Sequence, residues 1–327
     1  MYKVSILVPI YGVEQYIERC SRSLFEQTYQ NLEYVFVNDC SPDGSVAVLN
    51  EVIADYPNRK DDIVIVDHKL NRGLAAARNT GLDNSSGSFV ICVDSDDWLE
   101  PNAIELLVNG QSENNADIVT GGYLVHNDEA EPDMLKGRYY KDKEQMVLQM
   151  MQRTWDHFVA GRLVRRSLFV DNEVQWEEGL DVAEDRYIMS ILAYYSLESV
   201  SIDEVIYHYE RRNCHALTKS SDGKSLLRNN NQELRNLLLL ERFFRDKETV
   251  YQKECSRCVM DQLVNNWKTA LSFSDKTEYY DIVRMIDNRP DAELEQFRWE
   301  KKGVKGWIIH HYYIMKNYQR YSKFFCR

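Results

Sequence analysis

The chain has 327 residues, of which 44% are hydrophobic and 28% charged, a balance typical of an ordinary globular protein rather than a disordered one. The formal net charge of −12 argues against nucleic acid as a partner, because an acidic surface repels phosphate groups. The seven cysteines are odd in number and scattered, which argues against a disulfide framework. Residues 1–11 fit a strand better than a signal peptide, and no apolar run reaches the length of a membrane span, so we expect a cytoplasmic protein.

Strand and helix patterns alternate four times in the first hundred residues. The strands are expected at 4–9, 34–37, 63–66 and 89–93, and the first and third helices at 13–27 and 74–84, with another after the turn 41–44. With connections this short, the rhythm predicts a parallel sheet with right-handed crossovers and helices on its faces. Later elements are expected as a strand at 117–125, bulged at Gly121-Gly122, and helices at 188–195, 226–245, 250–273 and 276–286.

Three carboxylates, Asp94, Asp96 and Asp97, follow the fourth expected strand within four residues. Two carboxylates about 4 Å apart repel each other by about 4 kcal/mol at an effective dielectric constant near 20, so the cluster is costly unless a metal or bases compensate it. One interpretation is therefore a cation site. The other is an acidic turn before a helix that Pro101 would open at its first position.

Polar side chains follow each expected strand of this sheet. Tyr11, Asp39 and the acids at 94–97 would meet at one edge, where open α/β sheets bind their ligands. A nucleotide is the ligand we expect, with Tyr11 near the base, Asp39 accepting from a base N–H, and a metal at Asp96 bridging diphosphate oxygens. Neither a P-loop nor a G-x-G-x-x-G motif follows any of these strands, so the chemistry must depend on the acids.

Five motifs give the chain a family resemblance. They are Val4–Tyr11, Val37–Asp39, Asn71–Gly73, Ala77–Gly81 and Val93–Asp97. In this order and spacing, the chain resembles family 2 glycosyltransferases. The resemblance implies a GT-A fold, which is an α/β architecture with a Rossmann-like, mostly parallel sheet flanked by helices. It also implies a nucleotide-sugar donor, usually a UDP-sugar, and Mn²⁺ or Mg²⁺ held by the D-x-D element.

The same resemblance implies roles for single residues. Asp39 matches the family's base-reading aspartate, Asp94 its ribose- or base-side acid, and Asp96 its metal ligand. Arg78 stands where the family has a basic residue close to the nucleotide. Further donor contacts are expected from Pro9, Tyr11, Glu14, Asn71, Gly73 and Ser95. The chain departs from the family pattern at Gly12, where Asn is usual, and at Cys40, where Gly is usual.

A Glu-Asp pair precedes the helix expected at 188–195. An Asp at a helix start is most often a cap, but residues 179–187 resemble the family motif whose Asp is the general base. We therefore expect Asp185 as the base and Glu184 as its orienting neighbour, with Asp181 as the competing assignment. An acceptor hydroxyl needs such a base to become a nucleophile. The resemblance implies inversion at the anomeric carbon, which residue spacing alone does not decide.

Residues 207–218 resemble the family's loop of tyrosines and arginines that covers the donor. His215 in this segment is a second candidate for contact with the metal or the diphosphate. The alternative is a surface histidine without such a role.

The chain is expected to have three parts. They are a catalytic domain at 1–222, with a nucleotide-sugar half at 1–100 and an acceptor half at 101–222, a helical extension at 223–297, and a basic aromatic tail at 298–327. The extension either packs beside the catalytic domain or forms a homodimer contact. The tail has eight Lys or Arg against one Glu. It either binds the inner face of the cell membrane, at about 1 kcal/mol per basic residue, or packs on the acidic remainder of the chain.

The expected function is metal-dependent, inverting transfer of a hexosyl or N-acetylhexosaminyl group to a glycan or lipid-linked glycan, in the synthesis of a bacterial-type surface polysaccharide. A sugar-1-phosphate nucleotidyltransferase is one alternative, although such enzymes have a glycine-rich basic loop where this chain has residues 9–14. A non-catalytic nucleotide- or sugar-binding module is another, and it would not need Asp185.

Overall fold

The computed structural model describes residues 2–128, 131–137, 140, 142–152, 157–213, 216, 223–272, 281–282 and 284–285. The chain forms two compact units, Met1–Lys219 and Ser220–Arg327. His215 and the basic tail 298–327 lie outside the described residues, so the predictions made for them stay predictions.

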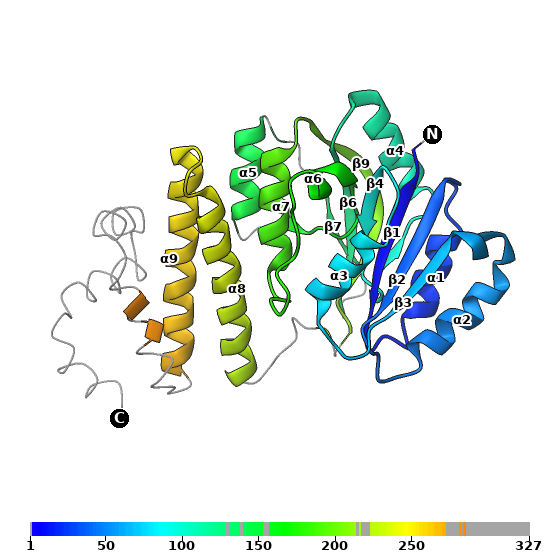
Figure 1. Ribbon diagram of the computed structural model, residues 1–327, viewed down its shortest axis with the longest axis horizontal. Coiled ribbons are helices and arrows are strands. Elements are labelled where there is room, and N and C mark those ends of the chain that lie inside the picture. Colours follow the sequence, from blue (N-terminus) through cyan, green and yellow to red (C-terminus); the bar gives the residue numbers. More distant parts are fainter. Residues whose placement is uncertain are drawn as a thin grey trace. The chain divides into compact units, whose positions relative to one another are not determined.

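The first unit is built on a sheet whose first half is parallel, as the alternating pattern predicts. Its strands are β1 (Val4–Ile10), β2 (Leu32–Asn38), β3 (Ile63–Asp67) and β4 (Phe89–Cys92). β1 lies between β2 and β4, and β2 pairs with β3, all in parallel. The four carboxyl ends therefore share one edge of the sheet, which confirms the expected gathering of strand exits (Figure 1).

The second half of the sheet is mixed. Its strands are β5 (Trp98–Leu99), β6 (Ile118–His126), β7 (Asp133–Leu135), β8 (Arg162–Arg165) and β9 (Ser199–Glu210). The strand order is β3-β2-β1-β4-β8-β6-β9-β5, with β7 paired to β6. The register between β6 and β9 shifts on both sides of Gly122, which confirms the predicted bulge. β8 is antiparallel to both β4 and β6, so it joins the two halves.

Helices cover both faces of the sheet (Figure 1). They are α1 (Ile17–Phe25), α2 (Ser45–Asp55), α3 (Leu74–Asp83), α4 (Ala103–Asn114), α5 (Lys143–Met151), α6 (Arg166–Val170) and α7 (Glu184–Tyr195), with a 3₁₀ turn, η1 (Pro57–Asp62). Alternate residues of β1, among them Ile6 and Val8, form one core with apolar residues of α1, α2 and α4. On the opposite face Gly81 lets α3 approach Leu7 and Val37 of the strands. α4 begins at Ala103, two residues after the predicted opening at Pro101.

The second unit contains the long helices α8 (Gly223–Phe244) and α9 (Thr249–Ser272), near the predicted ranges. The buried residues of α8 recur at helical spacing, including Leu234, Leu237 and Phe244, and Asn230 donates to Thr269 of α9 at 3.0 Å. Cys255 and Cys258 are buried, as expected for thiols on a helix face. Among the helices of the described residues, none is both long and apolar enough to cross a membrane.

Candidate active site

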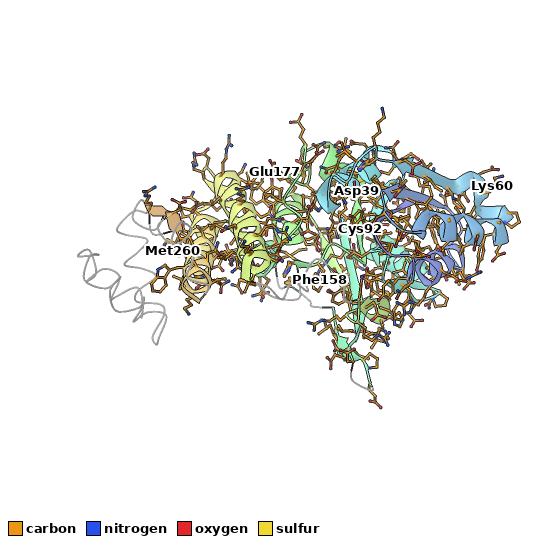
Figure 2. All side chains as sticks on the ribbon, turned by 90° about the horizontal axis from the view of Figure 1, so that it is seen from below. Asp39, Lys60, Cys92, Phe158, Glu177 and Met260 are labelled. Atoms are coloured by element: carbon orange, nitrogen blue, oxygen red, sulfur yellow. The ribbon has the colours of Figure 1, made fainter. Side chains whose placement is uncertain are left out.

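Asp39 organises the loops at the exits of β2 and β3. Its carboxylate accepts hydrogen bonds from the backbone N–H groups of Arg72 and Gly73, each at 2.8 Å, and it lies 2.6 Å from His68 Nδ1. The residue is only 3% exposed. Figure 2 shows where it lies among the side chains of the first unit. Asp39 therefore holds the Asn71–Gly73 motif at the sheet edge. This structural role is separate from the contact with a nucleotide base that the sequence predicts for it.

Gly73 is required by the backbone at the start of α3. Its φ of +92° lies in the left-handed region, and a Cβ there would come within 2.4 Å of Asp181 Oδ2. The other oxygen of Asp181 accepts from Ala75 N at 2.9 Å. Burial raises the pKa of Asp181 above its usual value. Asp181, the competing candidate for the base, thus accepts a hydrogen bond from the first turn of α3.

The three acids after β4 are not equivalent. Asp97 is 1% exposed, and its two oxygens accept from Glu210 N at 2.7 Å and from Tyr207 Oη at 2.6 Å. Burial raises the pKa of Asp97 well above its usual range. Asp97 therefore attaches this loop to β9. Asp94 and Asp96 are then the two acids of the loop that are candidates to bind a ligand.

Asp94 and Asp96 offer oxygen ligands to a divalent cation. Asp96 accepts from Asn213 Nδ2 at 2.8 Å, while burial, followed by the charge of Asp94, raises the Asp96 pKa to about 6. Mg²⁺-type ions are commonly held by one or two carboxylates together with substrate phosphates. Within the described part of the chain there is no group of three His, Cys, Asp or Glu able to hold a metal by itself. The residues fit a cation shared with a ligand.

Arg78 of α3 connects this acid loop to the Glu-Asp pair of α7. Its Nη1 lies 2.7 Å from Glu184 Oε1 and 2.7 Å from Asp185 Oδ1, and its Nη2 lies 3.0 Å from Asp94 Oδ1. Burial favours a neutral guanidinium, but the three carboxylates outweigh it and raise the Arg78 pKa above its usual value. We call Arg78, Asp94, Glu184 and Asp185 the Arg78 cluster. It brings together residues separated by more than a hundred positions.

Within the Arg78 cluster, the two acids of α7 differ. Burial, followed by the charge of Asp185, raises the Glu184 pKa to about 8, which favours the protonated form of Glu184. Asp185 accepts a second hydrogen bond from Val159 N at 3.2 Å. Neither acid caps α7, whose N-cap Ala183 makes no side-chain hydrogen bond. The carboxylate of Asp185 can still accept a proton, because two oxygens offer about four lone-pair sites.

The remaining predicted donor contacts lie around the same edge. Tyr11 is 51% exposed, whereas Ser95 is buried at 5%. Pro9 is buried within β1, and Asn71 is exposed. Glu14 accepts from Gly44 N at 2.8 Å and so ties the β1 exit to the start of α2.

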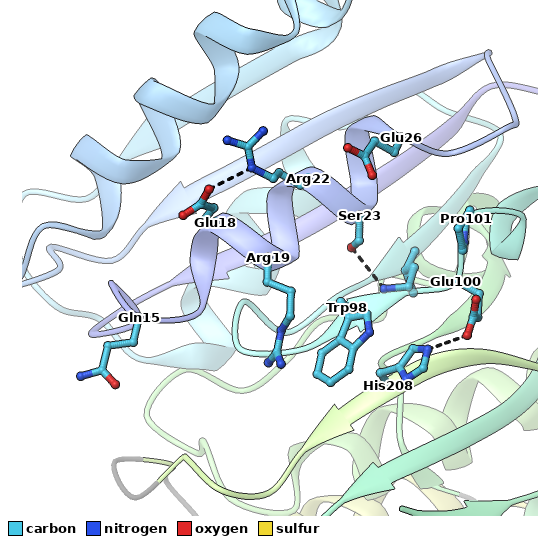
Figure 3. Close-up of a pocket in the computed structure, with 11 residues that line it drawn as sticks. Gln15, Glu18, Arg19, Arg22, Ser23, Glu26, Trp98, Glu100, Pro101 and His208 are labelled. Carbon is cyan, nitrogen blue, oxygen red and sulfur yellow. Dashed lines mark hydrogen bonds and ion pairs between the residues drawn. The ribbon is translucent and has the colours of Figure 1, made fainter.

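A pocket of about 660 Å³ lies beside the acid loop on the α1 face (Figure 3). Arg19 stacks on Trp98 at 3.5 Å from the ring centroid and donates to the Asp96 carbonyl at 3.0 Å. His208 stacks on Trp98 and lies 2.8 Å from Glu100. Sequence inspection missed this support of the acid loop, because only the fold brings α1, β5 and β9 together. The one signal was Trp98 directly after the acids.

Known structures share this arrangement of sheet and helices. The S. aureus TarS 1–349 fragment, solved with UDP, superposes with a TM-score of 0.63 at 18% identity, covering 95% of this chain and 87% of that one. The mannosyltransferase PcManGT from Pyrobaculum calidifontis, solved with GDP-Man and Mn²⁺, gives a TM-score of 0.56 at 15% identity, with 99% and 83% covered. The fold is that of the GT-A glycosyltransferases, as the sequence resemblance implies.

Sequence relatives identify the family. Residues 5–171 match the profile of glycosyl transferase family 2, and the chain belongs to this family of glycosyltransferases. Glycosyltransferase GlyA of Streptococcus pneumoniae is 42% identical over 126 residues, 38% of this chain and 17% of that protein. The uncharacterized glycosyltransferase EpsJ of Bacillus subtilis is 33% identical over 223 residues, 66% and 63% respectively. The chain thus spans less than two thirds of either relative.

A third relative carries a more specific name. The poly(ribitol-phosphate) beta-glucosyltransferase of Bacillus spizizenii is 27% identical over 213 residues, which is 63% of this chain and 32% of that protein.

Proposed function

We propose that the protein transfers a sugar from a nucleotide-sugar donor, a UDP-sugar in the first instance, to a hydroxyl of a surface glycan or lipid-linked glycan, with inversion. The observation that carries the proposal is the Arg78 cluster, in which Asp185 of α7 and Asp94 of the acid loop contact one guanidinium. A candidate base and a candidate donor-side acid are thereby neighbours. TarS, solved with UDP, and the poly(ribitol-phosphate) glucosyltransferase support the choices of donor and acceptor class.

The proposed reaction is a single displacement. Asp185 takes the proton of the acceptor hydroxyl while that oxygen bonds to the sugar C1. The bond between C1 and the diphosphate oxygen breaks with its electron pair, and the nucleoside diphosphate leaves. Attack from the side opposite the leaving group inverts C1.

A divalent cation fits the acid loop as part of this proposal. Asp96 would hold it, with Asp94 close by, and His215 remains a candidate further along the chain. When bound, Mn²⁺ or Mg²⁺ would neutralise charge on the diphosphate. The presence of Mn²⁺ with GDP-Man in PcManGT supports this choice.

The test begins with a screen of nucleotide sugars, each with and without Mn²⁺, by thermal shift and by release of nucleoside diphosphate. We expect one donor to stabilise the protein and to be consumed. The Asp185→Asn variant should then lose about 10²- to 10⁴-fold in kcat, because it lacks the base, while UDP binding stays within about threefold of wild type.

Two outcomes would contradict the proposal. Formation of a nucleotide sugar and pyrophosphate from UTP and a sugar-1-phosphate would identify a nucleotidyltransferase. Donor binding without any turnover by the wild-type protein, across glycan and lipid-linked acceptors, would indicate a binding module.

A further inference from the structure

Arg78 is a buried residue whose hydrogen bonds all go to acidic side chains. It is 1% exposed, and all its hydrogen bonds come from the Nη end of the guanidinium, to Asp94, Glu184 and Asp185. Its Nε is buried without a hydrogen-bond partner among the described residues. Leaving a buried donor unpaired costs about 1–3 kcal/mol, so the carboxylates determine how this side chain lies.

The Arg78 contacts constrain Asp185 from one side, and the main chain constrains it from the other. Nη1 of Arg78 lies 2.7 Å from Oδ1, and Val159 N lies 3.2 Å from Oδ2. Two donors on opposite oxygens fix the plane of the carboxylate.

The other terminal nitrogen of Arg78, Nη2, contacts the acid loop, which we assign to the sugar donor. Asp94 has 31% of its side chain exposed, against 12% for Asp185, and its Oδ1 lies 3.0 Å from Nη2. The planar guanidinium directs its two Nη groups at acids on two separate elements, a fixed geometry that the compact ammonium group of lysine does not have. One rigid cation therefore joins the acid loop to the start of α7.

We propose that Arg78 is a positioning residue for the general base: it orients Asp185 and couples it through Asp94 to the donor-binding loop. This inference rests on the proposed function and assigns Arg78 a task other than contact with the nucleotide. It acts through Asp185 and touches neither substrate.

The variants Arg78→Gln and Arg78→Lys separate charge from geometry. In Arg78→Gln we expect kcat to fall about 10- to 100-fold and the acid limb of the pH–rate profile to move up, because Asp185 loses its neighbouring cation. In Arg78→Lys we expect a similar fall in kcat with a smaller movement of the acid limb. The dissociation constant of UDP should stay within about threefold of wild type in both.

Arg59 provides the matched control. It is 5% exposed, and the hydrogen bonds of its guanidinium go to the backbone carbonyls of Phe25, Gln27 and Gln30. Arg59→Lys should lower the melting temperature, as loss of a buried guanidinium does, yet leave kcat and the acid limb where they are. A purely structural role for Arg78 would make its variants behave like Arg59→Lys.

The outcomes are distinct. If UDP affinity falls in parallel with kcat and the acid limb does not move, Arg78 is a donor ligand or a structural residue and the inference is overturned. Should Arg78→Gln fail to fold, the double variant Arg78→Gln/Glu184→Gln removes one carboxylate left without its partner, and the same movement of the acid limb is expected. A wild-type protein that turns over no nucleotide sugar overturns the proposed function itself.

Discussion

At the scale of single residues, the two departures from the family pattern have opposite backbone consequences. Gly12 and Cys40 both have positive φ, +66° and +58° respectively. Glycine adopts this region freely, whereas a residue with a Cβ pays about 1–2 kcal/mol. Cys40 therefore keeps a conformation that suits glycine, at a cost in stability.

The strain at Cys40 leads to a prediction. Cys40→Gly should stabilise the first unit by up to about 1 kcal/mol, because relief of the strain exceeds the extra freedom that glycine gains on unfolding. Chemical denaturation at equilibrium measures the change. Cys40→Ala retains a Cβ and should bring no such gain, so equal stabilisation by both variants would rule out the backbone explanation.

Glu184 predicts a pH dependence of stability. Its pKa is about 8 in the folded protein against an ordinary value of 4.5, so the folded state keeps a proton that the unfolded chain releases. The stability from protonated Glu184 is complete below pH 4.5 and is lost as the pH rises towards 8. Relative to wild type, Glu184→Gln should therefore gain stability across this window, by at most about 1.4 kcal/mol per pH unit. Urea unfolding at pH 5, 6.5 and 8 measures the difference, and a constant difference would contradict the assignment.

At the scale of elements, the Asn71–Gly73 motif at the start of α3 has a structural role that does not depend on a ligand. Gly73 and Gly12 both have positive φ, but a Cβ at Gly73 meets Asp181 Oδ2 at 2.4 Å, while one at Gly12 meets nothing within 4 Å. Asp39 binds the same turn through Gly73 N. Because Gly73 has no Cβ, the carboxylates of both Asp39 and Asp181 can lie close to this turn.

A pair of alanine variants tests this explanation. Gly12→Ala should cost about 1 kcal/mol, because it introduces only the left-handed strain. Gly73→Ala should cost more, since Asp181 must also move away from α3. Thermal and urea unfolding of the two variants gives the comparison. Equal losses in the free energy of unfolding would mean that the close approach of Asp181 does not contribute to the cost at Gly73.

The elements predicted from local pattern and those missed differ in one respect. β1 to β4, α3, α7 and α8 have apolar runs or helical periodicity strong enough to indicate their type from sequence. β9 (Ser199–Glu210) was missed, because residues 207–210 were assigned with 211–218 to the loop that covers the donor, whereas they pair with β6, and residues 207 and 208 also with β5. Hydrogen bonds to distant strands leave no periodic trace in the residues themselves.

At the scale of the whole molecule, the chain divides into two compact units, Met1–Lys219 and Ser220–Arg327. Phe244 is fully buried in the second unit and contacts the rings of Phe243 and Tyr251. Phe244→Ala should destabilise that unit by about 3–5 kcal/mol through loss of buried area and formation of a cavity. UDP binding, which we assign to the first unit, should not change. Calorimetric unfolding together with titration by UDP tests both statements, and loss of UDP binding would show that the units depend on each other.

The sequence alone determined the parallel half of the sheet, the shared edge where its strands end, and the family, because these depend on short motifs and on periodic burial. It also singled out Asp94, Asp96 and Asp185 as acids that need explaining. Only the tertiary structure decided which acids are free and which are occupied: Asp97 is bound by Tyr207 and Glu210, and Asp185 shares Arg78 with Asp94. A hydrogen bond or a raised pKa depends on the neighbour that the fold supplies, and for Asp97 and Asp185 those neighbours lie more than a hundred residues away along the chain.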